Sequence, residues 1–158
     1  ASDVYKRQTI PWMEFAKITG MPQELKEKIG HLKYSSVQTA YFPDNLDTEA
    51  QWVYYPDPEL SYHRILVRHN FCNGSKGYWT ECNSTRVDET TESTFQYMNQ
   101  YAYPLNTIGK PEIMKELLEW AKTRRVYGLG RWGEHQHYNS DLVVELALKM
   151  AEELNSAQ

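Results

Sequence analysis

The sequence predicts a mixed α+β fold, in which an antiparallel sheet with helices is followed by a helix, a short strand and a second helix. Two observations lead to this prediction. Residues 34–83 are rich in Tyr, Val, Thr and Trp, and Pro, Asp, Asn and Gly interrupt them, which is typical of strands and turns. Residues 110–158 instead repeat apolar side chains at helical spacing. We therefore expect a boundary near Gly109.

The first residues carry little structural signal. Residues 1–9 show no periodicity and no helix cap, so we expect them to be a truncation or an assembly scar. The first helix is expected after Pro22, because proline suits the first helical position. Leu25, Ile29 and Leu32 then share one helical face.

The β-rich part is expected to form an antiparallel meander of four strands, at residues 34–42, 51–55, 62–71 and 77–83. In the third of these, Arg64 and Arg68 alternate with the apolar Ile65 and Val67. Because neighbouring residues of a strand point to opposite faces, one face is polar and the other mostly apolar. The polar face should meet something polar.

The last third of the chain is expected to form part of an α/β layer. Pro111 begins a helix whose apolar face carries Met114, Leu117 and Ala121. Residues 125–129 predict a short strand and residues 141–154 a second helix. The sequence leaves open which of three good capping residues precedes that helix: Asn139, Ser140 or Asp141.

Three glycines after the short strand formally match the dinucleotide-binding pattern G-x-G-x-x-G: Gly128, Gly130 and Gly133. We reject that assignment, because the glycines of the working motif open the helix directly, whereas seven residues separate Gly133 from Asp141 here. What remains is a strand end, flexible backbone, the cation Arg131 and a helix start with partial positive charge. Anions suit such a place. The alternative is a loop with one solvated arginine.

Two further groups of residues suggest chemistry. Arg64 could hold a phosphate on the polar strand face with its planar guanidinium, although an ordinary surface salt bridge is the alternative. His135 and His137 lie beside Glu134 in a His-x-His arrangement, but no third ligand follows at a definite spacing. We therefore expect no metal site.

Charge and hydropathy exclude several classes of partner. The net charge is −4, and no stretch concentrates Lys and Arg as phosphate-backbone binding requires, so no nucleic acid is expected. No apolar run approaches the ~20 residues of a membrane span. Because no signal peptide opens the sequence either, we expect a cytoplasmic protein without a membrane span.

Five short blocks resemble UDP-galactopyranose mutase and its relatives by their order and spacing: Gln51–Pro56, Tyr62–Ile65, Tyr78–Glu81, Tyr101–Pro104 and Gly130–Gly133. These relatives are FAD proteins that share a glutathione-reductase-like flavin fold with amine oxidases and protoporphyrinogen oxidases. The resemblance implies FAD as the cofactor.

The resemblance also implies which residues would meet that cofactor. In the family, the arginine of the Gly-Arg block contacts FAD, and this block is Gly130–Arg131 here. The next helix points its start, at Asn139, Ser140 and Asp141, toward the flavin. A helix start is partially positive and a reduced flavin carries negative charge, so the two suit each other.

For the substrate, the resemblance implies a site containing Arg64, Tyr103 and His137. Arg64 matches the strand arginine that holds the substrate diphosphate, and Tyr103 matches an aromatic residue lining the active site. His137 stands where mutases keep a diphosphate-binding tyrosine, and Asn139 stands where bacterial enzymes have Asp. Flavin binding is thus implied more strongly than the mutase reaction itself.

The resemblance implies that residues 10–109 belong to a substrate-binding domain and residues 110–158 to the C-terminal part of an FAD-binding domain. We expect the N-terminal FAD-binding segment to be missing, because no dinucleotide-binding unit precedes Ile10. The expected function is that of a fragment of an FAD-dependent isomerase acting on a nucleotide-sugar or another small molecule. The alternatives are an oxidoreductase similar to amine or protoporphyrinogen oxidases, a non-catalytic carbohydrate-binding module with an aromatic platform, and a fragment without activity of its own.

Overall fold

The computed structural model describes residues 6–87 and 92–156. The chain divides into two compact units, which we treat separately. Residues 1–34 and 103–158 form the first, here called the terminal unit, and residues 35–102 form the second, the central unit. Residues 10–34 therefore group with residues 110–158. The assignment of substrate-binding and FAD-binding domains to parts of the chain stays a prediction.

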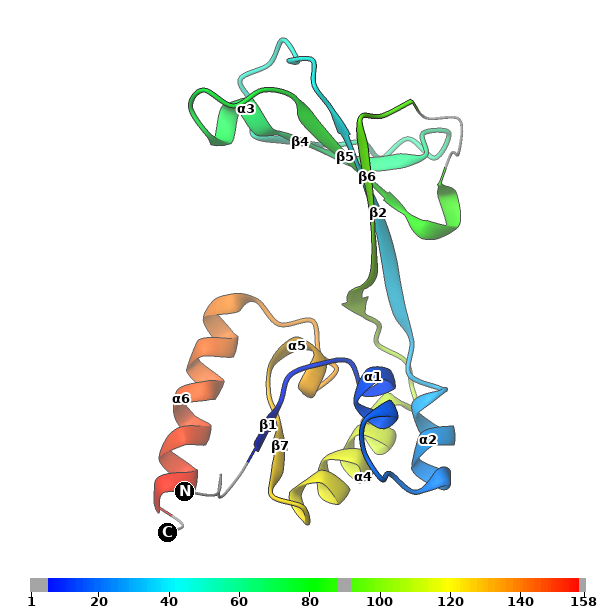
Figure 1. Ribbon diagram of the computed structural model, residues 1–158, viewed down its shortest axis with the longest axis vertical. Helices are drawn as coiled ribbons and strands as arrows, with labels where there is room; N and C mark the ends of the chain where they lie inside the picture. The colour runs from blue at the N-terminus through cyan, green and yellow to red at the C-terminus, as the bar shows by residue number, and fades with distance from the viewer. Residues whose placement is uncertain (1–5, 88–91, 157–158) are drawn as a thin grey trace. The chain divides into compact units, whose positions relative to one another are not determined.

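A five-stranded sheet, with the order β3-β4-β5-β2-β6, dominates the central unit (Figure 1). Its strands are β2 (Tyr34–Phe42), β3 (Trp52–Tyr54), β4 (Tyr62–Val67), β5 (Tyr78–Asn83) and β6 (Phe95–Pro104). The pairs β3–β4, β4–β5 and β2–β5 are antiparallel. Together with the helices and the small parallel sheet of the terminal unit, this gives the mixed fold that the sequence predicts.

The strand order corrects the predicted meander. A meander would place β2 beside β3, but β2 pairs with β5, in a register that runs from Val37 opposite Asn83 to Phe42 opposite Tyr78. The lengths of the strands explain why β2 pairs with β5 and not with β3, because β5 offers six residues for pairing with the long β2 whereas β3 has three. The short β3 is left at the edge of the sheet, where short strands are tolerated.

Strand β4 is shorter than predicted. It ends at Val67, and Arg68–Phe71 form the one-turn helix α3. Its predicted alternation is confirmed, because Ile65 and Val67 are buried while Arg64, which precedes them, is partly exposed. After β5, the short helix η1 (Ser84–Arg86) begins with the Asn83 side chain accepting a hydrogen bond from the backbone of Thr85 at 3.0 Å.

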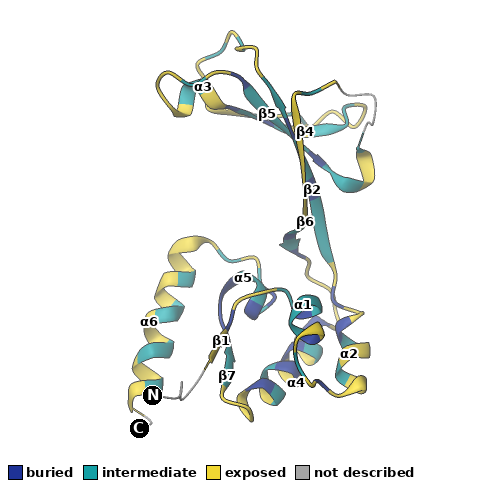
Figure 2. Cartoon of the chain, in the orientation of Figure 1, coloured by how far each residue is buried: buried dark blue, intermediate teal, exposed yellow. Residues whose placement is uncertain are grey.

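The terminal unit is built of helices around two parallel strands. The helices are α1 (Trp12–Lys17), α2 (Gln23–Ile29), α4 (Lys110–Lys122), α5 (Gly130–Gly133) and α6 (Ser140–Ser156). The main core joins α1, α2 and α4 through Trp12, Ile29, Leu117 and their neighbours (Figure 2). By contrast, α6 contains no buried residue.

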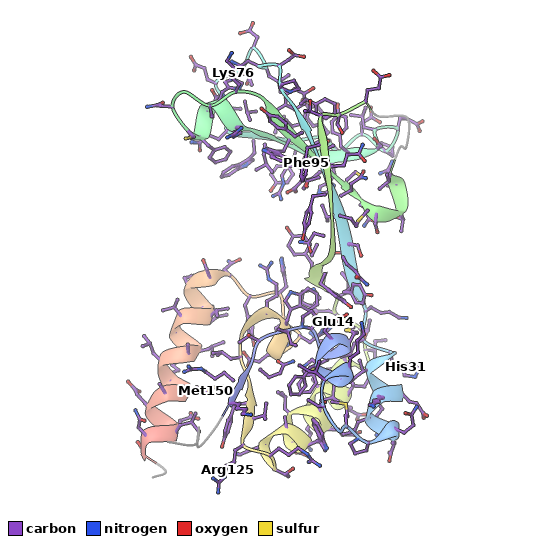
Figure 3. The ribbon with its side chains drawn as sticks, in the orientation of Figure 1. Glu14, His31, Lys76, Phe95, Arg125 and Met150 are labelled. Carbon is purple, nitrogen blue, oxygen red and sulfur yellow. The ribbon has the colours of Figure 1, made fainter. Side chains whose placement is uncertain are left out.

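Strand β1 (Lys6–Gln8) pairs in parallel with β7 (Val126–Gly128), setting Lys6 opposite Val126 and Gln8 opposite Gly128. The sequence did not predict β1, because these three residues fell within the expected scar at residues 1–9, of which residues 1–5 lie outside the described ranges. The chain enters β7 through Arg125, whose φ of 56° lies in the left-handed region (Figure 3). No helix in the described ranges is long and apolar enough to cross a membrane.

Candidate functional site

Two of the three glycines in the G-x-G-x-x-G match are explained by close packing of backbone. A Cβ atom on Gly128 would lie 2.5 Å from the Gly133 carbonyl oxygen, and one on Gly133 would lie 2.2 Å from the Gln8 carbonyl oxygen. Side chains larger than hydrogen do not fit at such distances. Gly128 and Gly133 therefore allow the backbones of β7, α5 and β1 to pack closely. This packing explains the two glycines without any bound ligand.

Gly130 has a different role, because its φ of 76° turns the chain as it leaves β7. This is the left-handed region, which glycine adopts without steric penalty. The Gly130 backbone N–H donates to Glu134 Oε2 at 3.2 Å. Burial raises the pKa of the Glu134 carboxyl group, and the bond from Gly130 opposes that shift. A Cβ atom on Gly130 would lie 3.4 Å from the nearest side-chain atom of Val143 in α6.

Arg131, Tyr103 and His137 lie together in the terminal unit. Arg131 Nη2 donates to the Tyr138 carbonyl oxygen at 2.9 Å, and Arg131 Cζ lies 5.3 Å from the centre of the Tyr103 ring. The Tyr103 ring meets the His137 ring edge to face, with centres 5.0 Å apart. The structure thus brings the predicted flavin contact Arg131 next to two of the predicted substrate residues.

The start of α6 completes this group. The Asn139 carbonyl oxygen accepts the first backbone bond of the helix, from Val143 N–H at 3.1 Å, so Asn139 occupies the capping position that the sequence left open. Ser140 is the first helical residue, and Asp141 lies exposed in the first turn.

Arg131 and the beginning of α6 line one open hollow of about 500 Å³, together with Tyr138, Val143 and Val144. Backbone N–H groups at a helix start lack partners within the helix and carry partial positive charge. The Arg131 guanidinium adds a full positive charge, while the two valines are apolar. A flat ring system carrying negative charge matches this combination.

Two buried polar side chains, Lys110 and His135, hold the loop from residue 134 to residue 138, and sequence reasoning missed the first of them. Lys110 is 4% exposed, and its Nζ donates to the His135 carbonyl oxygen at 3.1 Å and to Gln136 Oε1 at 2.9 Å. Burial lowers the pKa of Lys110. In the sequence Lys110 resembled an ordinary solvated lysine at a helix start, so no signal marked it.

His135 is fully buried and lies 3.0 Å, through Nε2, from the Lys33 carbonyl oxygen. Its other ring nitrogen, Nδ1, is buried and has no hydrogen-bond partner in the described part of the chain. Burial lowers the pKa of His135. His137, two residues on, is exposed. The two imidazoles thus have different surroundings, and the described residues contain no group of three or more His, Cys, Asp or Glu side chains arranged to hold a metal ion.

Arg64 lies in the central unit and is engaged by its neighbours. Its Nε donates to Glu81 Oε2 at 2.7 Å, its Nη2 bonds to the same oxygen, and its Nη1 donates to the Tyr54 hydroxyl group at 3.1 Å. The Arg64–Glu81 ion pair is partly buried. This is the salt bridge that the sequence offered as the alternative, and a substrate role for Arg64 stays a prediction.

No protein-family model and no curated protein sequence matches the chain. Among the solved structures that share its fold are the following two. A reduced UDP-galactopyranose mutase aligns with a TM-score of 0.66 and 19% identity, over 82% of this chain and 36% of the mutase. A protein assigned as a protoporphyrinogen oxidase, from Exiguobacterium sp. 255-15, aligns with a TM-score of 0.52 and 12% identity, over 80% of this chain and 36% of that one.

At these identities the likeness establishes the fold alone. The chain spans 36% of the length of each of the two structures. The five sequence blocks resemble UDP-galactopyranose mutases, and the resemblance implies a fold shared with protoporphyrinogen oxidases. Both kinds of enzyme are found among the similar structures, so the resemblance is confirmed at the level of a flavoenzyme-like fold. The roles of individual residues stay predictions.

Proposed function

We propose that this chain forms part of an FAD-dependent enzyme similar to UDP-galactopyranose mutase, and that its terminal unit binds the flavin. One observation carries the proposal: the Arg131 guanidinium and the start of α6 line the same hollow. A cation and a helix start that converge on one apolar-walled space suit a ring system that gains negative charge on reduction.

The groups lining the hollow fit such a cofactor. Arg131 uses Nη2 to bind the Tyr138 carbonyl oxygen, whereas its Nε and Nη1 donate to no atom in the described ranges. These N–H groups and the first backbone amides of α6 would donate to the flavin. Val143 and Val144 would contact its apolar edge.

When bound, the flavin would supply electron transfer, or in a mutase nucleophilic attack on the sugar. The residues of this chain would bind and orient. We propose that Tyr103 and His137, which touch each other beside Arg131, contact a nucleotide-sugar substrate. The diphosphate role of Arg64 is less favoured, because Glu81 already neutralises its guanidinium.

An FAD-dependent oxidoreductase is the second candidate, since the fold is shared with the assigned protoporphyrinogen oxidase as well as with the mutase. We further propose that a segment outside these 158 residues supplies the adenosine site of FAD, in keeping with the 36% of the mutase length that the chain covers. The product formed from UDP-galactopyranose by the reconstituted enzyme separates the two candidates: a ring-contracted sugar at constant oxidation state indicates an isomerase, and an oxidised product an oxidoreductase.

The binding proposal is tested by titrating the chain with FMN, which carries the flavin ring and one phosphate but needs no adenosine site. We expect Arg131→Ala to weaken FMN binding about tenfold or more, because a hydrogen bond from a charged group contributes about 1.5–3 kcal/mol. Arg124→Ala is the matched control, since Arg124 lies in the same unit but over the Trp120 ring, 4.4 Å from its centre. Equal FMN affinities in the two variants would contradict the proposal.

A further inference from the structure

A second cavity lies entirely within the central unit. It has a volume of about 260 Å³, and strands β2, β4 and β5 contribute most of its lining. The nine lining residues are Gln38, Ala40, Phe42, Ser61, Tyr62, Ile65, Tyr78, Thr80 and Cys82. The cavity is smaller than the ~300–1,000 Å³ of sites for drug-sized ligands, so its occupant would be a small molecule.

The strand register places this cavity on the face of the sheet opposite Arg64. Ile65 lines the cavity and lies opposite Thr80, which also lines it. Their chain neighbours Arg64 and Glu81 pair with each other, and alternate residues of a strand point to opposite faces. Phe95 packs edge to face against Trp79, which alternates with the cavity residues Tyr78 and Thr80 and therefore points to the same face as Arg64. The cavity is therefore separate from the predicted diphosphate residue.

The residues at the centre of the cavity explain why space is left there. Ala40, Thr80 and Cys82 are small and lie on the adjacent strands β2 and β5, with Ala40 directly opposite Thr80. Larger rings surround them. Phe42 and Tyr78 stack with centres 5.0 Å apart and an angle of 13° between their planes.

The lining carries no side chain that is charged at neutral pH. Burial raises the pKa of the Tyr78 hydroxyl group and the pKa of the Cys82 thiol, so both remain protonated at neutral pH. An anionic ligand would find no cation in the lining and would lose its hydration on entry. The occupant should accordingly be uncharged.

The polar groups of the cavity are mostly hydroxyl groups without partners. The hydroxyls of Tyr62, Tyr78 and Thr80 make no hydrogen bond to any described residue, so they are available to a ligand. The Gln38 amide is held in place, because its Nε2 donates to Gln96 Oε1 at 3.2 Å and its Oε1 accepts from the Cys82 thiol at 3.7 Å. Aromatic faces with several hydroxyl groups suit a ring that is apolar on its faces and polar around its rim.

We propose that this cavity binds one uncharged sugar ring, as a site separate from the flavin hollow. Phe42 and Tyr78 would provide the aromatic wall, and Thr80 and Tyr62 would bond the sugar hydroxyl groups. The proposal does not depend on the proposed function, because every lining residue lies in the central unit and Arg131 lies in the terminal unit.

The test is a titration of the whole chain with D-galactose, D-glucose and D-mannose, followed by the backbone amide resonances in NMR spectra. At least one hexose should give saturable shifts at Ala40, Thr80 and Cys82. The 1-phosphate of the hexose that binds should bind at least tenfold more weakly than the free sugar, because the lining contains no cation. Thr80→Val, which replaces the hydroxyl by a methyl group of similar size, should weaken hexose binding about fivefold.

Thr39→Val is the matched control. Thr39 lies between Gln38 and Ala40 on β2 and points to the opposite face, so this variant should bind the hexose like the wild type. Amide spectra of both variants report whether the sheet is intact. The proposal is wrong if no hexose gives saturable shifts at these residues, if the 1-phosphate binds as well as the hexose, or if the two variants bind alike. None of these results bears on FMN binding by the terminal unit.

Discussion

The guanidinium carbon of Arg131 lies 5.3 Å from the centre of the Tyr103 ring, while Arg131 Nη2 is bonded to the Tyr138 carbonyl oxygen. Residues separated by 28 positions in the chain thus orient one cation at the start of α6. A cation over an aromatic face is attracted by the electron density of the ring. Tyr103 is accordingly expected to position Arg131 as well as to contact a substrate.

Replacing Tyr103 tests this positioning. Tyr103→Leu removes the aromatic ring, and we expect FMN binding to weaken about two- to fivefold, since an exposed cation–π contact is worth about 0.5–1 kcal/mol. Tyr103→Phe keeps the ring and should retain wild-type affinity, as measured by quenching of FMN fluorescence. Equal losses in the two variants would mean that the hydroxyl group, and not the ring, matters.

Lys110 should stabilise the loop that follows α5. Lys110→Met leaves the His135 carbonyl oxygen and the Gln136 amide oxygen without their donor, and we expect the free energy of unfolding to fall by about 1–3 kcal/mol. Lys115→Met, on the exposed side of the same helix, should change it by less than about 0.5 kcal/mol. Urea unfolding of the two variants measures both values, and similar stabilities would exclude this role for Lys110.

The buried His135 should make stability depend on pH in the acidic range. Burial, with a smaller contribution from the Lys110 charge, lowers the pKa of His135 in the folded chain below the unfolded value of 6.5. Below pH 6.5 the unfolded chain therefore binds more protons at this residue, and stability is lost as the pH falls from 6.5 toward the folded-state pKa.

His135→Gln should flatten this part of the stability–pH curve, and His31→Gln, which replaces an exposed histidine, should leave it unchanged. Urea midpoints recorded between pH 7.5 and pH 5 at intervals of about half a unit cover the window around the ordinary histidine pKa. A curve for His135→Gln that parallels the wild type would show that this imidazole does not titrate differently in the two states.

Gly133 should tolerate no side chain. In Gly133→Ala the new Cβ would lie 2.2 Å from the Gln8 carbonyl oxygen, so β1 and α5 would have to separate. We expect a loss of stability of about 3 kcal/mol or more, at the upper end of the overpacking range. Gly20→Ala, where nothing lies within 4 Å of the new atom, is the control and should unfold like the wild type.

Local pattern predicted some elements well. Strand β2 spans the predicted residues 34–42, and α6 begins at Ser140, directly after Asn139, one of the three expected capping residues. In both, the signal lies within the element itself, as strand-forming residues or as a capping residue before an apolar repeat.

Other elements depend on partners far away in the sequence. Strand β1 has three residues and exists through its pairing with β7, while the neighbour of β2 depends on which strand matches its length. Strand β6 was missed because its first six residues, Phe95 to Gln100, are all exposed and show no alternation of burial. The support of the site by Lys110 was equally hidden, since burial of a lysine is a property of the packed fold.

In the proposed function, Arg131 and the start of α6 form a positively charged hollow for the flavin. This proposal is tested most directly by the reduction potential of FMN bound to the chain, compared between wild type and Arg131→Ala. Positive charge near the ring should stabilise the reduced, anionic flavin, so the potential in the wild type should lie above that of free FMN and should fall toward the free value in Arg131→Ala. A bound potential that is equal in the two proteins would contradict the proposed role of Arg131 in a positively charged flavin hollow.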